Sequence, residues 1–215
     1  MINIGLEDSN RREVTQVLNN LVSDEYLLST KTKNYHWNVT GPHFHVLHGL
    51  FGDQYTKLDQ LIDRIGERIR ALGAHAFGTM TEFPRCTRLQ ERPGMPTELA
   101  MVEDLCDDHE VLLRSLRGAL AGNASLRFDF GTTDFLTGAM QEHEKMAWML
   151  RSVLGKQAHL KKWLEVQEAI QRESGIDKCR SRLVADGQRF AVLTGDRSKT
   201  TTITLLTNWP AELKK

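Results

Sequence analysis

Four segments of this 215-residue chain repeat apolar residues at three- and four-residue steps, and that periodicity constrains the fold more than any other feature. Such spacing is typical of helices that bury one face against a shared core. Gly41-Pro42 separates the first two segments, and the proline-containing residues 73–96 join the second to the third. The segments are residues 9–37, 42–72, 97–120 and 132–154. Two helical hairpins joined by one long crossover predict an all-α four-helix bundle.

The composition is that of an ordinary globular protein, with 40% apolar and 26% charged residues. No apolar run reaches the roughly 18 residues that a membrane span needs. Residues 1–14 lack the apolar segment of a secretory signal. Cys86, Cys106 and Cys179 are odd in number and match no ligand spacing, so they indicate free thiols in a reducing compartment. The sequence therefore predicts a cytoplasmic protein that contacts no membrane.

His36, His48, Asp63 and Glu67 form the most informative set of polar residues. Mixed nitrogen and oxygen ligands suit iron or zinc. Asp63 and Glu67 are four residues apart, so they share one face of a helix. His48 precedes Asp63 by fifteen residues, which is only about 60° out of phase but about 22 Å along the helix. These residues cannot chelate one ion within one chain, so a shared metal site needs a second copy of the chain.

Several motifs resemble the Dps family, the DNA-binding proteins from starved cells, over about residues 8–154. The motifs are KNYHWNVTGP, LHGLF, DRIGERIRALG and HEKMAWMLRSVL. These proteins are miniature ferritins, and the resemblance implies a ferritin-like bundle that assembles as a hollow homododecamer. It also implies a ferroxidase that oxidises Fe(II) with hydrogen peroxide, stores the ferric mineral and so protects against oxidative stress.

The resemblance also implies how the site is shared between subunits. His36 and His48 would come from one subunit, and Asp63 and Glu67 from a dyad-related subunit, to hold two irons, with zinc as a substitute. Asp129 and Asp134 fall where the family lines a three-fold pore, although both are equally suited to loop and cap positions.

The chain departs from the family pattern at Gly52, where an acidic iron ligand usually follows the second histidine by four residues. This departure predicts a weak second iron. A bulge in the helix could bring in Asp53 instead. Restoring the acid as Gly52→Glu is expected to speed iron oxidation and to stabilise the helix by up to about 1 kcal/mol.

The residue pattern allows one alternative metal site and argues against another. His43, His45 and His48 lie close together and could bind zinc or copper independently. The bundle interior lacks the paired Glu-x-x-His motifs of full-size ferritins, because Glu67, Glu103 and Glu110 have no histidine three residues on. The pattern therefore favours an intersubunit site.

Residues 156–215 resemble no family, so we expect two domains, 1–155 and 156–215. Residues 156–173 predict a helix, Asp186-Gly187 a hairpin turn, and residues 200–209 a strand. Residues 155–215 contain 12 Lys and Arg but 7 Asp and Glu, a net charge of +5, which leaves −5 for residues 1–154 of this net-neutral chain. The extension is either a genuine accessory domain or sequence read past the usual end of the gene.

Two rival functions follow from these departures. The first is a structural or DNA-compacting shell, associated with the nucleoid, whose ferroxidase activity is impaired by Gly52. It is disfavoured because only Arg11 and Arg12 are basic in the N-terminal arm, so DNA binding should be weak. The second is a fusion in which the extension binds a partner and the cage serves as a scaffold.

Overall fold

The computed structural model describes residues 3–174, 183–185, 190–195 and 201–206. The chain divides into two compact units, Met1–Lys156 and Gln157–Lys215. Within the described residues, no helix combines the length and the apolarity that a membrane-spanning segment needs.

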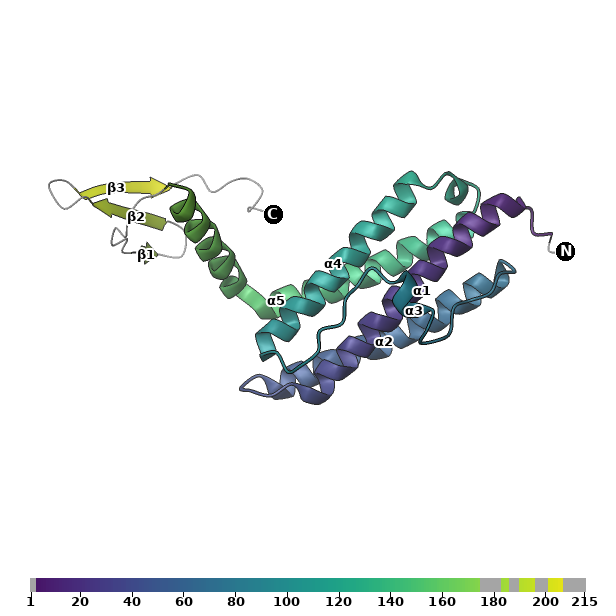
Figure 1. Cartoon of the computed structure of the whole chain (residues 1–215), viewed down its shortest axis with the longest axis horizontal. Helices are drawn as coiled ribbons and strands as arrows, with labels where there is room; N and C mark the ends of the chain where they lie inside the picture. The colour runs from purple at the N-terminus through teal and green to yellow at the C-terminus, as the bar shows by residue number, and fades with distance from the viewer. Residues whose placement is uncertain (1–2, 175–182, 186–189, 196–200, 207–215) are drawn as a thin grey trace. The chain divides into compact units, whose positions relative to one another are not determined.

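The first unit is a four-helix bundle, which confirms the fold class predicted from the sequence (Figure 1). Its long helices are α1 (Asp8–Asn38), α2 (Phe44–Ala71), α4 (Glu98–Gly122) and the first part of α5 (Phe130–Ser174). The pair α1 and α2 forms the first hairpin. In the second hairpin α4 is tied to α5, because Arg151 donates to Glu110 at 2.8 Å.

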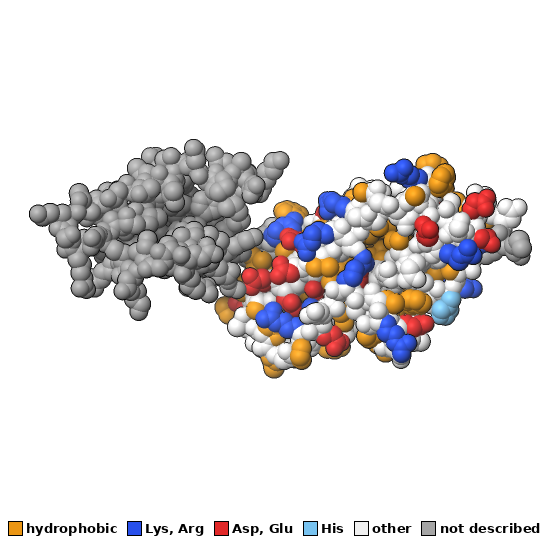
Figure 2. Space-filling model, turned by 45° about the horizontal axis from the view of Figure 1, so that its top comes forward, with side chains coloured by type: hydrophobic (Ala, Val, Ile, Leu, Met, Phe, Trp, Pro, Cys, Tyr) orange, Lys and Arg blue, Asp and Glu red, His pale blue; other side chains and the backbone are white. Residues whose placement is uncertain are grey.

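The predicted apolar stripes meet in one core. Each fully buried aliphatic or aromatic side chain contributes about 1.5–3 kcal/mol relative to exposure. Buried core residues from all four helices include Leu18, Leu28, Phe51, Leu58, Leu61, Ile65, Leu105, Leu112, Leu136 and Leu150. Figure 2 shows acidic and basic groups interspersed over the visible face of this unit.

Local caps mark the ends of two of the helices. Gly73 adopts φ 81° directly after α2, a conformation that suits glycine. Thr97 caps α4 by accepting a hydrogen bond from the amide of Ala100 at 3.4 Å. The crossover between α2 and α4 contains the short helix α3 (Phe83–Cys86), and the turn η1 (Ala124–Arg127) joins α4 to α5.

One buried carboxylate pins the crossover to α1. Asp24 is fully buried and accepts hydrogen bonds from the Thr87 hydroxyl at 2.9 Å and from the Arg88 amide at 2.6 Å. It also pairs with the Arg88 guanidinium. These bonds satisfy the buried charge, as a carboxylate in a protein interior requires.

Helix α5 changes direction at Gly155, where φ is 53° and ψ is −149°. The helix continues to Ser174, as predicted for residues 156–173. The strands β1 (Leu183–Ala185), β2 (Phe190–Gly195) and β3 (Thr201–Leu206) form an antiparallel sheet in the order β1-β2-β3. The predicted Asp186-Gly187 turn lies outside the described residues.

Cys86 and Cys106 are the cysteines among the described residues, and both are free thiols, as expected. Burial raises the pKa of the Cys106 thiol to about 11, so it stays protonated and behaves as a small apolar group. Cys179 lies outside the described residues.

Candidate functional site

His36 at the end of α1 and His48 near the start of α2 bind each other's backbone. The His36 Nδ1 lies 2.7 Å from the carbonyl oxygen of His48, and the His48 Nδ1 lies 2.9 Å from the carbonyl oxygen of His36. The two rings are stacked, with their centroids 3.8 Å apart and their planes inclined by 20°. His36 and His48, twelve positions apart and on either side of the Gly41-Pro42 turn, thus form a symmetrical pair.

This arrangement fixes the tautomer of both rings. A carbonyl oxygen only accepts, so each Nδ1 must carry the hydrogen and donate it. In the neutral imidazole the remaining nitrogen, Nε2, then holds a lone pair that can bind a metal ion. A backbone carbonyl that holds the distal ring nitrogen is the usual support for a metal-binding histidine. The structure therefore prepares His36 and His48 as two Nε2 donors.

Aromatic neighbours and a glycine hold the stacked pair in place. Tyr55 meets the His36 ring edge-on with centroids 5.2 Å apart, and Phe44 stacks on His48 at 5.2 Å. Gly52 lies directly against His36, because a Cβ atom at position 52 would be 3.2 Å from the His36 Cε1 and 3.4 Å from Nδ1. The missing side chain at Gly52 leaves the room that the His36 ring occupies.

Asp63 and Glu67 lie further along α2, both exposed. Their neighbouring arginines bind other groups: Arg64 donates to Glu142 and Arg68 to Asp129, each at 2.7 Å. Among the described residues, no hydrogen bond or ion pair engages either Asp63 or Glu67. The two carboxylates are therefore available to a ligand, whereas a solvated helix face paired with its arginines would have been the simpler arrangement.

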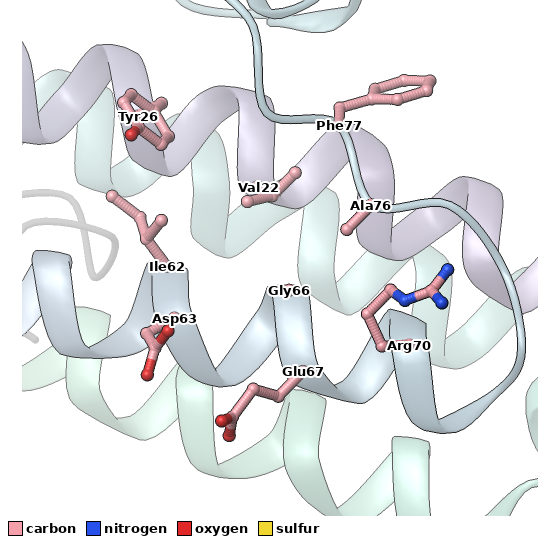
Figure 3. A pocket seen from close by; sticks show the side chains of 9 residues that line it. All are labelled: Val22, Tyr26, Ile62, Asp63, Gly66, Glu67, Arg70, Ala76 and Phe77. Atoms are coloured by element: carbon pink, nitrogen blue, oxygen red, sulfur yellow. The ribbon is translucent and has the colours of Figure 1, made fainter.

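Asp63 and Glu67 border an open hollow between α1 and α2 (Figure 3). Figure 3 shows both carboxylates projecting to the same side of α2, with Ile62 pointing from α2 toward α1, where Val22 lies. The full lining is Val22, Tyr26, Ile62, Asp63, Gly66, Glu67, Arg70, Ala76 and Phe77. An apolar hollow with carboxylates at its margin is a surface that a second polypeptide could cover.

The structure does not bring the four predicted ligands together within one chain. Because α2 is a single helix from Phe44 to Ala71, the fifteen residues between His48 and Asp63 span about 22 Å. Within the described part of the chain, no group of three or more His, Cys, Asp and Glu side chains could hold a metal ion. Each chain thus carries a pair of imidazoles and, about 22 Å further along α2, a separate pair of carboxylates.

Asp53 does not take the place of the missing acid at Gly52. Helix α2 stays α-helical through both positions, and the Thr56 hydroxyl donates to the Gly52 carbonyl at 2.8 Å. Asp53 is exposed and lies about 100° round the helix from Gly52. The bulge considered from the sequence is absent from this helix.

The other sequence candidates have different partners. His43 binds Glu98, Nδ1 to Oε1 at 2.7 Å, and His45 is exposed, so these histidines do not join His48 in a separate site. Asp129 is buried and caps α5 by accepting from the Thr132 amide at 3.0 Å while it pairs with Arg68, whereas Asp134 is exposed. Asp129 is therefore a cap, and only Asp134 is free to line a pore.

Two tryptophans lie outside the core of the bundle. Trp37 is 71% exposed and Trp148 is 60% exposed in the single chain. The helical phase of a residue in the sequence cannot by itself separate a core position from an exposed one.

Sequence reasoning also missed a polar chain inside the bundle. Glu25, His143 and His109 are fully buried and hydrogen-bonded in line across α1, α5 and α4. No short motif connects residues so far apart in the sequence, and only the burial of charged residue types on otherwise apolar faces could have indicated them.

Comparisons with known proteins agree with this fold. Residues 15–159 match the family described as Ferritin-like domain. A DNA protection during starvation protein 2 from Bacillus anthracis is 40% identical over 147 residues, which are 67% of this chain and 99% of that protein. An uncharacterized low temperature-induced protein from Nostoc sp. is 47% identical over 154 residues, 71% of this chain and 86% of that protein.

Solved structures are similar over the same region. DpsC from Streptomyces coelicolor has a TM-score of 0.69 at 28% identity and covers 72% of this chain and 90% of its own. A Dps protein from Vibrio cholerae O1, described as a member of a broad superfamily of ferritin-like diiron-carboxylate proteins, has a TM-score of 0.67 at 29% identity, over 72% of this chain and 96% of its own. The family match ends at residue 159, so most of the C-terminal extension lies outside it.

Proposed function

The chain belongs to the ferritin-like domain family, among its Dps proteins, and on that basis we propose that it is an iron-sequestering ferroxidase. It oxidises Fe(II) with hydrogen peroxide at sites shared between two subunits and stores the ferric product inside a hollow dodecamer. The observation that carries this proposal is the pair of prepared but incomplete half-sites, one where α1 meets the start of α2 and the other further along α2. His36 and His48 present two nitrogen donors, and Asp63 and Glu67 of a second copy complete the set.

The donor set suits the oxidation of iron. Imidazole nitrogens bind ferrous iron well, while carboxylate oxygens favour the harder ferric ion. Two ferrous ions supply the two electrons that reduce one peroxide molecule to water, so the reaction needs both irons at the site together. The Nδ1–H groups of His36 and His48 are held by backbone carbonyls, so both Nε2 lone pairs stay available to iron while its charge rises.

Gly52 weakens the hold on the second iron. The structure shows no substitute carboxylate from Asp53, because α2 is regular there. We infer that the first iron binds to the histidines and carboxylates together, and that the second is held more loosely, with water in the place of the missing ligand. Zinc suits the same donors, and a related Dps from Listeria innocua has been solved after soaking in zinc.

A mixed assembly tests whether the site is shared. One parent carries His36→Ala and His48→Ala, and the other carries Asp63→Ala and Glu67→Ala. Each parent alone should oxidise no iron. In a two-fold interface each mixed pair rebuilds one of its two sites, so random one-to-one mixing should restore about a quarter of the unmodified sites.

Controls separate this outcome from loss of assembly. Both parents must elute at the size of the unmodified protein. The Asp53→Ala variant removes another exposed α2 carboxylate and should keep full activity. If the mixture is as inactive as its parents while assembly is intact, the shared site is wrong.

The protective and cytoplasmic roles rest on relatives and composition. The similar protein from Bacillus anthracis is named for DNA protection during starvation, and removal of ferrous iron and peroxide would protect DNA without contact. We infer a cytoplasmic location from the free thiols of Cys86 and Cys106, which suit a reducing compartment. Direct DNA binding should be weak, because basic and acidic groups are interspersed on the visible face of the bundle and the extension carries a net charge of only +5.

A shell with impaired ferroxidase activity is the second candidate, and the observation that favours it is Gly52. Anaerobic titration with ferrous iron, followed by peroxide, separates the two functions. A ferroxidase should bind ferrous iron before peroxide is added and then oxidise two irons for each peroxide molecule consumed. A purely structural shell should leave the iron ferrous or oxidise it no faster than free solution does.

A further inference from the structure

A continuous chain of three ionisable side chains crosses the centre of the bundle. The Glu25 Oε1 on α1 lies 2.6 Å from the Nε2 of His143 on α5. The Nδ1 of His143 lies 2.8 Å from the Nδ1 of His109 on α4. All three side chains have 0% exposure. Among the described residues, the Glu25 Oε2 and the His109 Nε2 have no hydrogen-bond partner.

No other charge neutralises Glu25 within this site. Among the described residues, His143 is the one ion-pair partner of Glu25. The other charge that acts on the chain is that of Arg151 on α5, which influences His109. Arg151 itself pairs with Glu110.

The hydrogen bonds allow two proton counts. A contact between two imidazole nitrogens needs one hydrogen between them, donated by one ring to the other. If His109 donates, His143 is neutral and gives its Nε2–H to Glu25, so the chain holds two protons and a net negative charge. If His143 donates, a third proton lies on the Glu25–His143 bond, the chain is neutral overall, and the His109 Nε2 carries a hydrogen.

Burial decides between these two arrangements. An uncompensated carboxylate in a protein interior is far more costly than a neutral group or a hydrogen-bonded ion pair. The cost is increased here because the second oxygen of Glu25 has no partner in the described structure. Burial also holds the pKa of His109 well below its usual value, so the additional proton does not reside on that ring.

We propose that Glu25, His143 and His109 form a buried proton-binding site that holds three protons at neutral pH. It joins α1, α5 and α4 as one electrically neutral unit. The proton shared by Glu25 and His143 makes His143 the donor to His109, which fixes His109 as the Nε2–H tautomer.

This site gives the bundle a stability contribution with an optimum near neutral pH. In the unfolded chain at pH 8 the carboxylate is ionised and both histidines are neutral, so unfolding releases one proton. Below about pH 6.5 the unfolded histidines bind up to two more protons, and unfolding then takes protons up. The contribution of the site is therefore greatest near pH 6.5 and declines on both sides.

Solid-state nuclear magnetic resonance of the intact, histidine-labelled protein counts these protons directly. At pH 7.5 we expect one ring to be protonated at both nitrogens or to share a proton with a carboxylate through Nε2. We expect the coupled second ring to be neutral, with its hydrogen on Nε2 and its lone pair on Nδ1. A coupled pair whose second ring carries its hydrogen on Nδ1, or in which both rings are doubly protonated, would overturn the proposal.

A matched pair of variants gives a second readout. In Glu25→Gln the amide keeps the shape of the side chain but removes the charge, so the chain should hold two protons in both the folded and the unfolded state. Between pH 7.5 and 8.5 the unfolding equilibrium constant of the unmodified protein should rise about tenfold relative to that of Glu25→Gln. The exposed Glu7→Gln variant should follow the unmodified protein. Parallel pH curves for Glu25→Gln and the unmodified protein would refute the three-proton site.

Discussion

The absence of a side chain at Gly52 makes room for the His36 ring, and substitution of Gly52 with alanine tests this interpretation. In the middle of a helix such as α2, glycine to alanine usually stabilises by up to about 1 kcal/mol. At Gly52 the new Cβ would lie 3.2 Å from the His36 Cε1, which is closer than the roughly 3.5–4.0 Å that two carbon atoms prefer. The ring cannot move away freely, because it is stacked on His48 and its Nδ1 is bonded to the His48 carbonyl.

The expected magnitude follows from these two opposing effects. Crowding in a packed region costs about 1–3 kcal/mol, so Gly52→Ala should leave stability unchanged or lower it by up to about 2 kcal/mol. Gly49 on the same helix is exposed and has no atom within 4 Å of a Cβ built there. Gly49→Ala should therefore gain close to the full helix-propensity benefit, at most about 1 kcal/mol.

Thermal unfolding of the two alanine variants, compared at the same assembly size, measures the difference. For a chain of this length 1 kcal/mol corresponds to roughly 2–4 °C in Tm, so Gly49→Ala should melt above Gly52→Ala by at least that amount. If Gly52→Ala is stabilised as much as Gly49→Ala, Gly52 does not make room for His36. That result would support the sequence-based expectation that Gly52→Glu stabilises the helix. The contact between position 52 and His36 predicts the opposite.

Three further predictions concern pH and charge. Burial, only partly offset by Lys31 at 2.6 Å, raises the pKa of Asp108 to about 6. The protonated carboxyl therefore stabilises the fold below about pH 4, and this contribution is lost as the pH rises to 6. Over that range unfolding curves should show that the unmodified chain loses up to about 3 kcal/mol of unfolding free energy relative to Asp108→Asn. The pKa of His109 is lowered by burial, so neutral His109 contributes stability above pH 6.5, and that contribution is lost as the pH falls. In denaturant titrations the unfolding free energy of His109→Gln should therefore fall less steeply with decreasing pH than that of the unmodified protein, by up to about 1.4 kcal/mol per pH unit. In gel shifts at low salt, deletion of residues 156–215 should abolish any DNA binding, and tight, salt-insensitive binding by the shortened chain would contradict this.

The bundle could be predicted from the sequence because its helices are specified locally. Gly73 and Thr97 limit two helices through their own backbone angles and side-chain bonds. Gly155 also marks the end of the fourth bundle helix, where its positive φ interrupts α5. Apolar periodicity, caps and glycines need no information about distant residues, so a single sequence contains them.

The site could be predicted only in part, because its chemistry depends on contacts between separate elements. The spacing of His48 and Asp63 showed that one chain cannot complete the site. It could not show that His36 and His48 exchange hydrogen bonds across twelve residues, or that Gly52 lies against His36. The Glu25–His143 contact joins residues 118 positions apart, and no helical period reports such a pairing.

The geometry of α2 has a consequence for how such a cage would work. His48 and Asp63 are fixed about 22 Å apart on one rigid helix. A two-fold axis that brings the carboxylates of one copy to the histidines of another must do the reverse as well. Each pair of subunits would therefore build two equivalent sites at once, or none. The exposed surface around the hollow beside Asp63 and Glu67 would be buried when the two subunits associate. Loss of this interface should remove iron oxidation completely, even though every ligand remains correctly folded in its own subunit.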